Sequence, residues 1–326
     1  MFYLNNPKVL ICDCDHKDVD SEKKVFGQAG VDFRWLHCTN EQEVIDSCQG
    51  AVVFLNQYAP MNEKVFKGVP SLKLIVRYGV GVDNVDVPAA TRCGVQVCNV
   101  PDYGTYEVAD HALALMLALV RKICMINSYT KEVDWDYKMT VPVHRNAART
   151  VGVVGVGRIG RAFADRVHAL GCRVIGYDSE YGNKGRSFPD YIEFMPLEQL
   201  LEQSDVVSLH CALTAESKDI IREKELKRMK PEAYLINVAR GGLIDEQALD
   251  KALDEHWIAG AGLDVVKNES LGRKNPLFRH SNLIITPHMA WYSEESAEEL
   301  NRKCAEEAVR FLRGETLHYP VNHLDQ

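Results

Sequence analysis

Short apolar runs recur along the whole chain, and polar or amphipathic stretches separate them. In the first third, the apolar runs have the length of buried strands, and the stretches 21–30 and 40–50 have the spacing of helices. The predicted strands of this part are 8–13, 31–37, 50–55, 72–79 and 95–100. Beyond residue 170 the predicted strands are 172–178, 205–210, 233–239, 258–266 and 283–288. Strands that alternate with helices predict an α/β protein with parallel sheets.

Two longer helices are predicted where the chain passes from one part to the next. The first is residues 105–124. This segment begins with Thr105, a residue typical of helix N-caps, and continues as a long apolar run with Arg121 near its end. The last helix is expected to begin near Ser293 and to stop at Gly314, because glycine readily adopts the backbone conformation that ends helices. That last helix is long enough to return the chain to its first part.

The segment 151–160, VGVVGVGRIG, is the most specific pattern in the chain. Gly155 allows a tight turn after a buried strand, Gly157 lets a pyrophosphate approach the positive end of a helix, and Gly160 lets helix and strand pack closely. The next strand ends at Asp178, whose carboxylate would accept hydrogen bonds from a ribose and repel a 2′-phosphate. This order predicts a dinucleotide site that prefers NAD to NADP. A βαβ unit without a nucleotide is the alternative.

We therefore expect a doubly wound parallel sheet, the Rossmann fold, together with a smaller flavodoxin-like α/β domain. The NAD-binding Rossmann domain is predicted to be continuous over residues 102–293. The substrate (catalytic) domain is predicted to combine both chain ends, residues 1–101 and 294–326. Ligand is expected in the cleft between the two domains.

Composition narrows the choice of partners. The chain has 326 residues, is 46% hydrophobic and carries a formal net charge of −8, which disfavours nucleic acid and anionic membranes as partners. Its ten cysteines are scattered without a CxxC pair or the spacing of a zinc site, so we expect no metal and a reducing, cytoplasmic location. The N-terminus lacks the pattern of a signal peptide, and the longest apolar run, 112–120, is too short to span a membrane.

Polar residues follow three predicted strands of the nucleotide domain: Arg240, then Asp264 with Glu269, then His288. In a doubly wound sheet such positions face the ligand crevice. An arginine there can hold a substrate carboxylate at two points, and a histidine can donate a proton as a hydride arrives. A carboxylate beside the imidazole favours its charged form. Each residue alone also fits a surface or structural role, but their joint occurrence favours catalysis on a 2-oxo acid.

Over nearly its whole length the chain resembles the D-isomer-specific 2-hydroxyacid dehydrogenases. The matching segments are 72–86, 97–119, 151–160, 236–249, 261–270 and 286–296. The resemblance implies that Arg240, Glu269 and His288 are the catalytic residues and that NAD is the cofactor. It also implies a homodimer built largely through the nucleotide domains.

The resemblance further assigns residues to ligands. Asp264 is expected near the nicotinamide, the backbone amides of Arg158 and Ile159 at the pyrophosphate, and those of Val80 and Gly81 at the substrate carboxylate. The residues expected to complete the cofactor site are Ala212, Val238 and Ala239. The sequence therefore predicts an NAD-dependent oxidoreductase that interconverts small 2-oxo acids and D-2-hydroxy acids.

Some positions resemble one branch of the family, the dehydrogenase-like C-terminal-binding proteins, which are corepressors that bind NAD. There the residue matching Arg77 contacts the substrate carboxylate, and the one matching Trp291 walls the substrate pocket. Tyr78, Tyr103 and Trp291 suggest a substrate pocket with aromatic walls. Lys267, Ser270 and Ala212 depart from the family pattern, and the loss of prolines at the last two positions is expected to loosen their loops.

Other functions stay open at this point. The branch resemblance keeps an NAD(H)-sensing corepressor as the alternative to an enzyme. Asp13 and Asp15 follow a strand, as in phosphatases of the haloacid-dehalogenase type, but the residues after them do not fit that motif. Formate dehydrogenases of the same fold pair their histidine with glutamine, so Glu269 argues against that activity.

Overall fold

The structure is a computed structural model that describes residues 8–183, 185 and 187–324. Residues 1–7, which carry the expectation about a signal peptide, lie outside the described residues. The chain divides into two compact units. The first combines the residues up to Gly104 with those from Ser293 onwards, and the second is Thr105–Tyr292. Within the described ranges, no helix combines the length and apolar character needed to cross a membrane.

The first unit is built on a five-stranded parallel sheet with the strand order β2-β1-β3-β4-β5. Its strands are β1 (Val9–Ile11), β2 (Phe33–Trp35), β3 (Val53–Asn56), β4 (Leu74–Arg77) and β5 (Gln96–Cys98). This order is that of the flavodoxin-like fold, as expected. Residues 31–37 were expected to form a buried strand, but β2 is a half-buried edge strand, because only one side of it has a neighbour in the sheet.

Helices cover this sheet, and asparagine side chains begin two of them. The helices are α1 (Asp20–Ala29), α2 (Glu41–Ser47), α3 (Glu63–Gly68), α4 (Val87–Arg92) and α11 (Glu294–Arg313). Asn40 and Asn62 accept hydrogen bonds from the first backbone amides of α2 and α3. Helix α11 begins after Ser293, which shares a capping box with Ser296, and ends at Gly314 with φ +68°. The predicted start and stop of the last helix are therefore confirmed.

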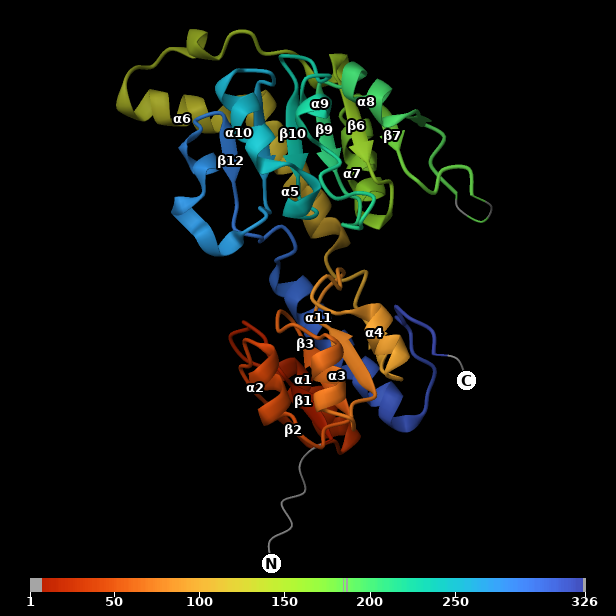
Figure 1. Ribbon diagram of the computed structural model, residues 1–326. Coiled ribbons are helices and arrows are strands. Elements are labelled where there is room, and N and C mark those ends of the chain that lie inside the picture. Colours follow the sequence, from red (N-terminus) through yellow and green to blue (C-terminus); the bar gives the residue numbers. More distant parts are fainter. Residues whose placement is uncertain (1–7, 184, 186, 325–326) are drawn as a thin grey trace, which may run out of the picture. The chain divides into compact units, whose positions relative to one another are not determined.

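The second unit is built on a seven-stranded parallel sheet with the order β12-β11-β10-β9-β6-β7-β8 (Figure 1). Its strands are β6 (Thr150–Val154), β7 (Arg173–Tyr177), β8 (Ile192–Phe194), β9 (Val206–Leu209), β10 (Tyr234–Asn237), β11 (Gly260–Leu263) and β12 (Leu283–Ile285). Counted from β6, the first six strands follow the order of the Rossmann fold. The order reverses between β6 and β9, so a ligand crevice is expected at the carboxyl ends of these two strands.

Helices pack on both faces of this sheet. The helices are α5 (Thr105–Val120), α6 (Ile123–Glu132), α7 (Arg158–Ala169), α8 (Leu197–Gln203), α9 (Glu223–Leu226) and α10 (Glu246–Asp254), and the short 3-10 turns are η1 (Tyr137–Thr140), η2 (Asn146–Ala148), η3 (Gly241–Leu243), η4 (Glu269–Lys274) and η5 (Pro276–Arg279). One apolar cluster joins α5 and α7 to one face, and a second joins α8, α9 and α10 to the other. Both faces of the strands are therefore buried, as in doubly wound folds.

The helix predicted over 105–124 is shorter than expected. Helix α5 ends at Val120, and Lys122 adopts a left-handed backbone conformation with φ +55° before α6 begins. That conformation breaks the ladder of i to i−4 hydrogen bonds. The buried side of α5 ends with Leu119 and Val120, so no core contact holds the following residues in line with it.

Candidate active site

The three glycines after β6 have different surroundings, which explain why each is glycine. Gly155 has φ +88°, and a Cβ there would lie 2.6 Å from the backbone nitrogen of Cys211. A Cβ on Gly160 would lie 2.0 Å from the carbonyl oxygen of Gly155. At Gly157 the same atom would meet nothing within 4 Å. Two glycines therefore permit close packing inside the turn, and the third borders open space that a ligand can approach.

Helix α7 begins directly after this turn. Gly157 is its N-cap, so the amides of Arg158 and Ile159 belong to the first turn, where backbone amides have no partner within the helix. Asp178 follows β7, and its carboxylate accepts hydrogen bonds from the amide of Val156 at 2.7 Å and from that of Glu180 at 2.8 Å. The acid therefore lies against the glycine turn. Each carboxylate oxygen has a second lone pair that suits a hydroxyl donor.

His210 lies at the same edge, and the sequence analysis did not single it out. Its Nε2 lies 2.8 Å from Ser208 Oγ, and its ring packs against Phe163. A Cβ on Gly160 would lie 3.2 Å from its Cβ, so His210 borders the glycine turn. Burial lowers its pKa to about 3, so the ring is neutral near neutral pH. Its position as the last residue of the predicted strand 205–210 is a signal that could have identified it.

The polar residues predicted at strand ends follow three neighbouring strands. β10 pairs with β11 and β11 with β12, all in parallel, and Asn237, Leu263 and Ile285 are level with one another. Arg240, Asp264 and His288 follow these three strand ends within a few residues. A Cβ on Gly241 would lie 2.1 Å from the backbone carbon of Val266. The turn after Arg240 therefore packs directly against the segment that leads to Glu269.

The structure brings His288 and Glu269 together. His288 Nδ1 lies 3.0 Å from Glu269 Oε1 and 3.2 Å from Oε2. A carboxylate only accepts hydrogen bonds, so Nδ1 carries the proton in this pair, and Nε2 is the ring nitrogen that can exchange a proton with a ligand. Both side chains are partly exposed, at 35% and 48%. The pair is therefore accessible from solution.

One buried carboxylate holds the turn that carries His288. Asp264 is 2% exposed, and it accepts hydrogen bonds from Thr286 Oγ1 at 2.5 Å, the Met289 amide at 3.0 Å and the Ala290 amide at 2.9 Å. The amide of His288 donates to the carbonyl oxygen of Asp264 at 2.8 Å. His288 itself has φ +53°, a conformation that few residues other than glycine adopt. The turn is therefore fixed by residue 264 at four points.

Other predicted residues of this unit line the same strand ends. The Ala239 amide donates to Asn237 Oδ1 at 3.0 Å, and Arg240 Nη1 donates to the Ala239 carbonyl at 2.7 Å. Val238 is 7% exposed, whereas Ala212 is exposed, and its carbonyl accepts a hydrogen bond from Ser217 Oγ at 2.6 Å. Trp291 packs on the core of the unit, with its ring edge-on to Tyr292 at 5.6 Å.

In the first unit, Arg77 lies over the turn that follows β4. A Cβ on Gly79 would lie 1.8 Å from Arg77 Nη1, so the guanidinium lies directly against this glycine, whose φ of +127° is one that other residues rarely adopt. Val80, 39% exposed, and the half-exposed Gly81 follow, and Asn99 Nδ2 donates to the Val80 carbonyl at 2.6 Å. The arginine and the two predicted amides therefore lie on one turn.

Tyr78 does not fit the expected aromatic pocket wall. Its side chain is 1% exposed, and its hydroxyl donates to Glu22 Oε1 at 2.7 Å within the core of the first unit. Its backbone amide donates to the carbonyl of Asn56. The side chain of Tyr78 is therefore part of the core, because its hydroxyl has a buried partner there.

One group of metal-ligand types occurs elsewhere among the described residues: Asp250, Asp254 and His280. His280 Nε2 lies 2.8 Å from Asp250 Oδ1, and Arg279 forms ion pairs with both aspartates. The guanidinium already supplies the positive charge that these carboxylates need. This group therefore gives no support for a metal.

The fold and the glycine turn define the class, a dinucleotide-binding α/β protein. Residues 113–290 match the family described as "D-isomer specific 2-hydroxyacid dehydrogenase, NAD binding domain". The chain therefore belongs to the D-isomer specific 2-hydroxyacid dehydrogenase family, and its cofactor is NAD. The narrower resemblance to the C-terminal-binding proteins stays a prediction.

Relatives extend the match beyond that domain. The chain is 40% identical over 289 residues to a glyoxylate reductase of Korarchaeum cryptofilum, covering 87% of this chain and 85% of that protein. It is 37% identical over 307 residues to a glycerate dehydrogenase of Methylorubrum extorquens, covering 92% and 95%. The solved D-lactate dehydrogenase of Aquifex aeolicus, complexed with NAD and lactic acid, has a TM-score of 0.86 at 27% identity and covers 94% of this chain and 96% of its own.

Proposed function

We propose that this protein interconverts 2-oxo acids and D-2-hydroxy acids with NAD(H). The observation that carries the proposal is the pair of His288 and Glu269, 3.0 Å apart. Glu269 follows β11 and His288 follows β12, and β11 is the neighbour of β10, which precedes Arg240. The histidine with its acid, and an arginine near them, supply the proton transfer and the carboxylate binding that this reaction needs.

Each residue has a separate task in the proposed reaction. His288 donates a proton from Nε2 to the carbonyl oxygen of a 2-oxo acid and takes it back in the other direction. Glu269 accepts the hydrogen bond from Nδ1 and so fixes the orientation and the tautomer of the ring. Arg240 binds the substrate carboxylate through two parallel hydrogen bonds and polarises the carbonyl. On the first unit, Arg77 and the amides of Val80 and Gly81 suit a carboxylate as well.

The second unit also has the features that a dinucleotide needs. The amides of Arg158 and Ile159 would bind the pyrophosphate beside the open space at Gly157. Asp178 would accept hydrogen bonds from the ribose. The residues proposed to line the rest of the cofactor site are Gly155, Gly160, Ala212, Val238, Ala239 and Asp264, whereas Trp291 is proposed to wall the substrate pocket. When bound, NAD(H) supplies or receives the hydride.

A comparison of substrates tests the proposal. Purified protein with NADH is given glyoxylate, hydroxypyruvate, pyruvate, 2-oxoisocaproate and phenylpyruvate in turn, and kcat/KM is measured for each. The names of the two curated relatives support glyoxylate and hydroxypyruvate as the best substrates. The product is expected to be the D isomer wherever it is chiral, and NADPH is expected to be a poorer cofactor because of Asp178.

Failure to oxidise NADH with every acid in the panel would overturn the proposed reaction. In that case NADH-dependent capture of a transcription factor would favour the corepressor alternative.

The ten free cysteines, most of them buried, support the cytoplasmic location proposed with this activity.

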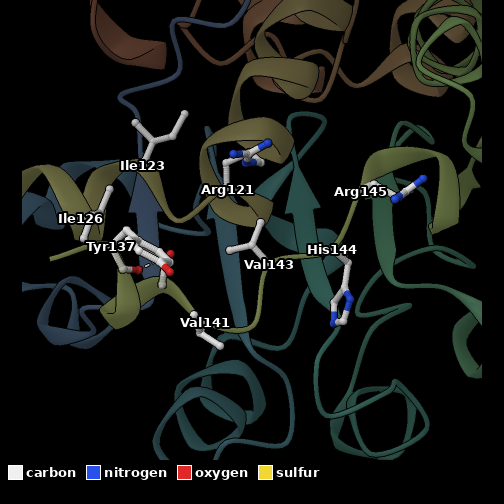
Figure 2. A pocket seen from close by; sticks show the side chains of 9 residues that line it. Arg121, Ile123, Ile126, Tyr137, Val141, Val143, His144 and Arg145 are labelled. Carbon is white, nitrogen blue, oxygen red and sulfur yellow. Dashed lines mark hydrogen bonds between the residues drawn. The ribbon is translucent and has the colours of Figure 1, made fainter.

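We infer that a second copy of the chain covers the segment 121–145. This segment contains an apolar groove next to basic residues, and Figure 2 shows Ile123, Tyr137 and Val141 around it with Arg121 and Arg145 nearby. Trp135, 90% exposed, lies on the same segment between two aspartates. Exposed apolar residues of the segment are Ile123, Met125, Val133, Tyr137, Met139 and Val141. The segment therefore contains an apolar groove, an exposed apolar side chain and charges of both signs. These features suit a two-fold symmetric interface, in which the same segment of each copy contacts that of the other.

Sedimentation equilibrium tests this interface. The wild type is expected to be a dimer, and Trp135→Ser is expected to weaken it by roughly 30-fold or more, the usual effect of losing an aromatic residue at the centre of an interface. Tyr181→Ser removes an aromatic residue that is 57% exposed outside the segment, and it is expected to leave the dimer intact. A monomeric wild type would contradict the inference.

A further inference from the structure

A histidine on a helix reaches the turn that holds His288. His111 lies in the first half of α5, and its Nε2 is 2.8 Å from Thr286 Oγ1 and 3.6 Å from Asp264 Oδ1. Thr286 in turn donates its hydroxyl proton to Asp264 Oδ1 at 2.5 Å. The three side chains therefore form one continuous chain of hydrogen bonds that ends on a buried carboxylate.

The direction of these bonds follows from the number of protons. A hydroxyl group has a single proton, and that of Thr286 is used toward Asp264. The oxygen of Thr286 must therefore act as the acceptor for His111, so His111 carries a proton on Nε2. With that donor in place, the hydroxyl keeps its orientation toward the carboxylate. Without it, the hydroxyl can rotate, and its oxygen loses a hydrogen bond in a poorly solvated place.

We propose that His111 is a positioning residue for His288 and acts through Thr286 and Asp264. Asp264 holds the turn of His288 at the amides of Met289 and Ala290 as well as at Thr286. His111 orients the one member of this set that has rotational freedom, the hydroxyl. The imidazole of His288 then keeps the direction in which it meets a substrate. The catalytic consequence rests on the proposed function of His288.

Packing alone does not explain a histidine at this position. The residues with which α5 faces the core are apolar, among them Val108, Ala112 and Leu115, and they need no hydrogen bond. The side chain of His111 is 19% exposed and lies at the margin of this surface. A polar ring that is mostly buried lowers stability unless it is hydrogen-bonded, and the bond recorded for His111 leads to the turn of His288.

Two substitutions at residue 111 separate positioning from packing. His111→Leu keeps an apolar side chain of similar size and removes the donor, whereas His111→Gln keeps an N–H donor near the place of Nε2. We expect His111→Leu to lower kcat for the 2-oxo acid by about 3- to 10-fold, the effect of one hydrogen bond, with KM little changed. His111→Gln is expected to recover most of kcat. A merely structural role predicts the opposite order, with the leucine variant at least as active as the glutamine variant.

A second pair tests the middle of the chain of bonds. Thr286→Ser retains the hydroxyl, and Thr286→Val retains the shape without it. The valine variant is expected to match His111→Leu in its loss of kcat, and the double variant is expected to lose no more than either single one, because both break the same connection. Additive losses would show that the two residues act separately and would overturn the proposal.

Nuclear magnetic resonance provides a readout that does not require turnover. In the wild type, the nitrogen signals of the His111 ring are expected to show the proton on Nε2, and the amides of Met289 and Ala290 are expected to exchange slowly. His111→Leu is expected to speed the exchange of both amides, and His111→Gln is not. A proton found on Nδ1 alone, or amide exchange that is unchanged in the leucine variant, would overturn the positioning role. If the wild type reduces no 2-oxo acid but these signals behave as expected, the proposed function fails and the positioning of the turn stands.

Discussion

Both units of the molecule use a buried aspartate after a strand to hold the turn that follows a neighbouring strand. In the first unit, Asp13 accepts hydrogen bonds from Asn56 Nδ2 and from the amides of Gln57, Tyr58 and Ala59 beyond β3. In the second unit, Asp264 does the same for residues 286–290 beyond β12.

The difference lies in what the held turn presents. The turn of the second unit carries His288, with φ +53° and a carboxylate at 3.0 Å, whereas the turn of the first unit carries no residue that we place in the reaction. A buried aspartate that holds a turn is therefore a structural feature common to both units. The chemistry depends on which side chain the turn carries. The structural role of Asp13 also accounts for its superficial resemblance to the aspartate of a phosphatase.

The largest expected effect on kcat comes from replacing His288, the side chain carried by the turn that Asp264 holds. His288→Asn is expected to lower kcat by about 100-fold or more, the usual contribution of general acid–base catalysis. Asparagine tolerates the left-handed backbone, so the turn itself is expected to survive. The matched control is His256→Asn, an exposed histidine with φ +56°, which is expected to leave kcat unchanged. Steady-state kinetics with NADH checks both, and a His288→Asn variant of near-normal kcat would remove His288 from the mechanism.

Removing each aspartate tests the comparison itself. Asp13→Ala and Asp264→Ala each leave several amides without an acceptor, so each is expected to lower the free energy of unfolding by roughly 2 kcal/mol or more. Asp264→Ala is also expected to lower kcat per folded molecule, because the turn of His288 loses its anchor. Asp13→Ala is expected to retain kcat. Calorimetry and kinetics on the same samples decide, and equal losses of kcat in both variants would contradict the distinction between the two turns.

The two units are also expected to respond to pH in opposite directions. Burial raises the pKa of Glu22, which has an ordinary value of 4.5, so the first unit binds its proton more tightly when folded. The contribution of Glu22 to the free energy of unfolding is complete below pH 4.5. It is lost as the pH rises through the pKa that Glu22 has in the folded protein. Burial lowers the pKa of His210 from 6.5 to about 3, so the second unit loses stability as the pH falls from 6.5 towards 3.

Calorimetric unfolding across this pH range measures both slopes. Glu22→Gln keeps an acceptor for the Tyr78 hydroxyl and is expected to flatten the loss above pH 4.5. His210→Gln keeps a polar partner for Ser208 and is expected to flatten the loss below pH 6.5. A slope that either variant leaves unchanged would show that another group causes it.

The smallest expected effect concerns a glycine that neither a turn nor a close contact requires. Gly27 lies inside α1, and a Cβ there would meet nothing within 4 Å, unlike the glycines after β6. Gly27→Ala is expected to raise the free energy of unfolding by about 0.5 to 1 kcal/mol, the difference in helix propensity. Gly30→Ala, at the C-cap of the same helix with φ +67°, is expected to lower it instead. Denaturant titration of the two variants checks the opposite signs.

Local signals were sufficient for much of the molecule. The order of apolar runs predicted the strands of both sheets except β8, which no predicted strand covers, and the last helix begins and ends where its serine and glycine indicated. The contacts of Gly155 and Gly160 agree with the close packing expected from the motif. The polar residues after β10, β11 and β12 were found because parallel strands place their carboxyl ends at one edge.

Tertiary structure alone decided the rest. Tyr78 was expected in a pocket, and its hydroxyl instead meets Glu22 in the core, 56 residues away in the chain. Lys122 interrupts a helix that its sequence would continue, because the buried side of α5 has already ended. His111 and Thr286 lie 175 residues apart and belong to no common motif. Such pairs are invisible in a sequence because they depend on which strand and which helix pack together, whereas caps, glycine turns and strand periodicity depend only on neighbours along the chain.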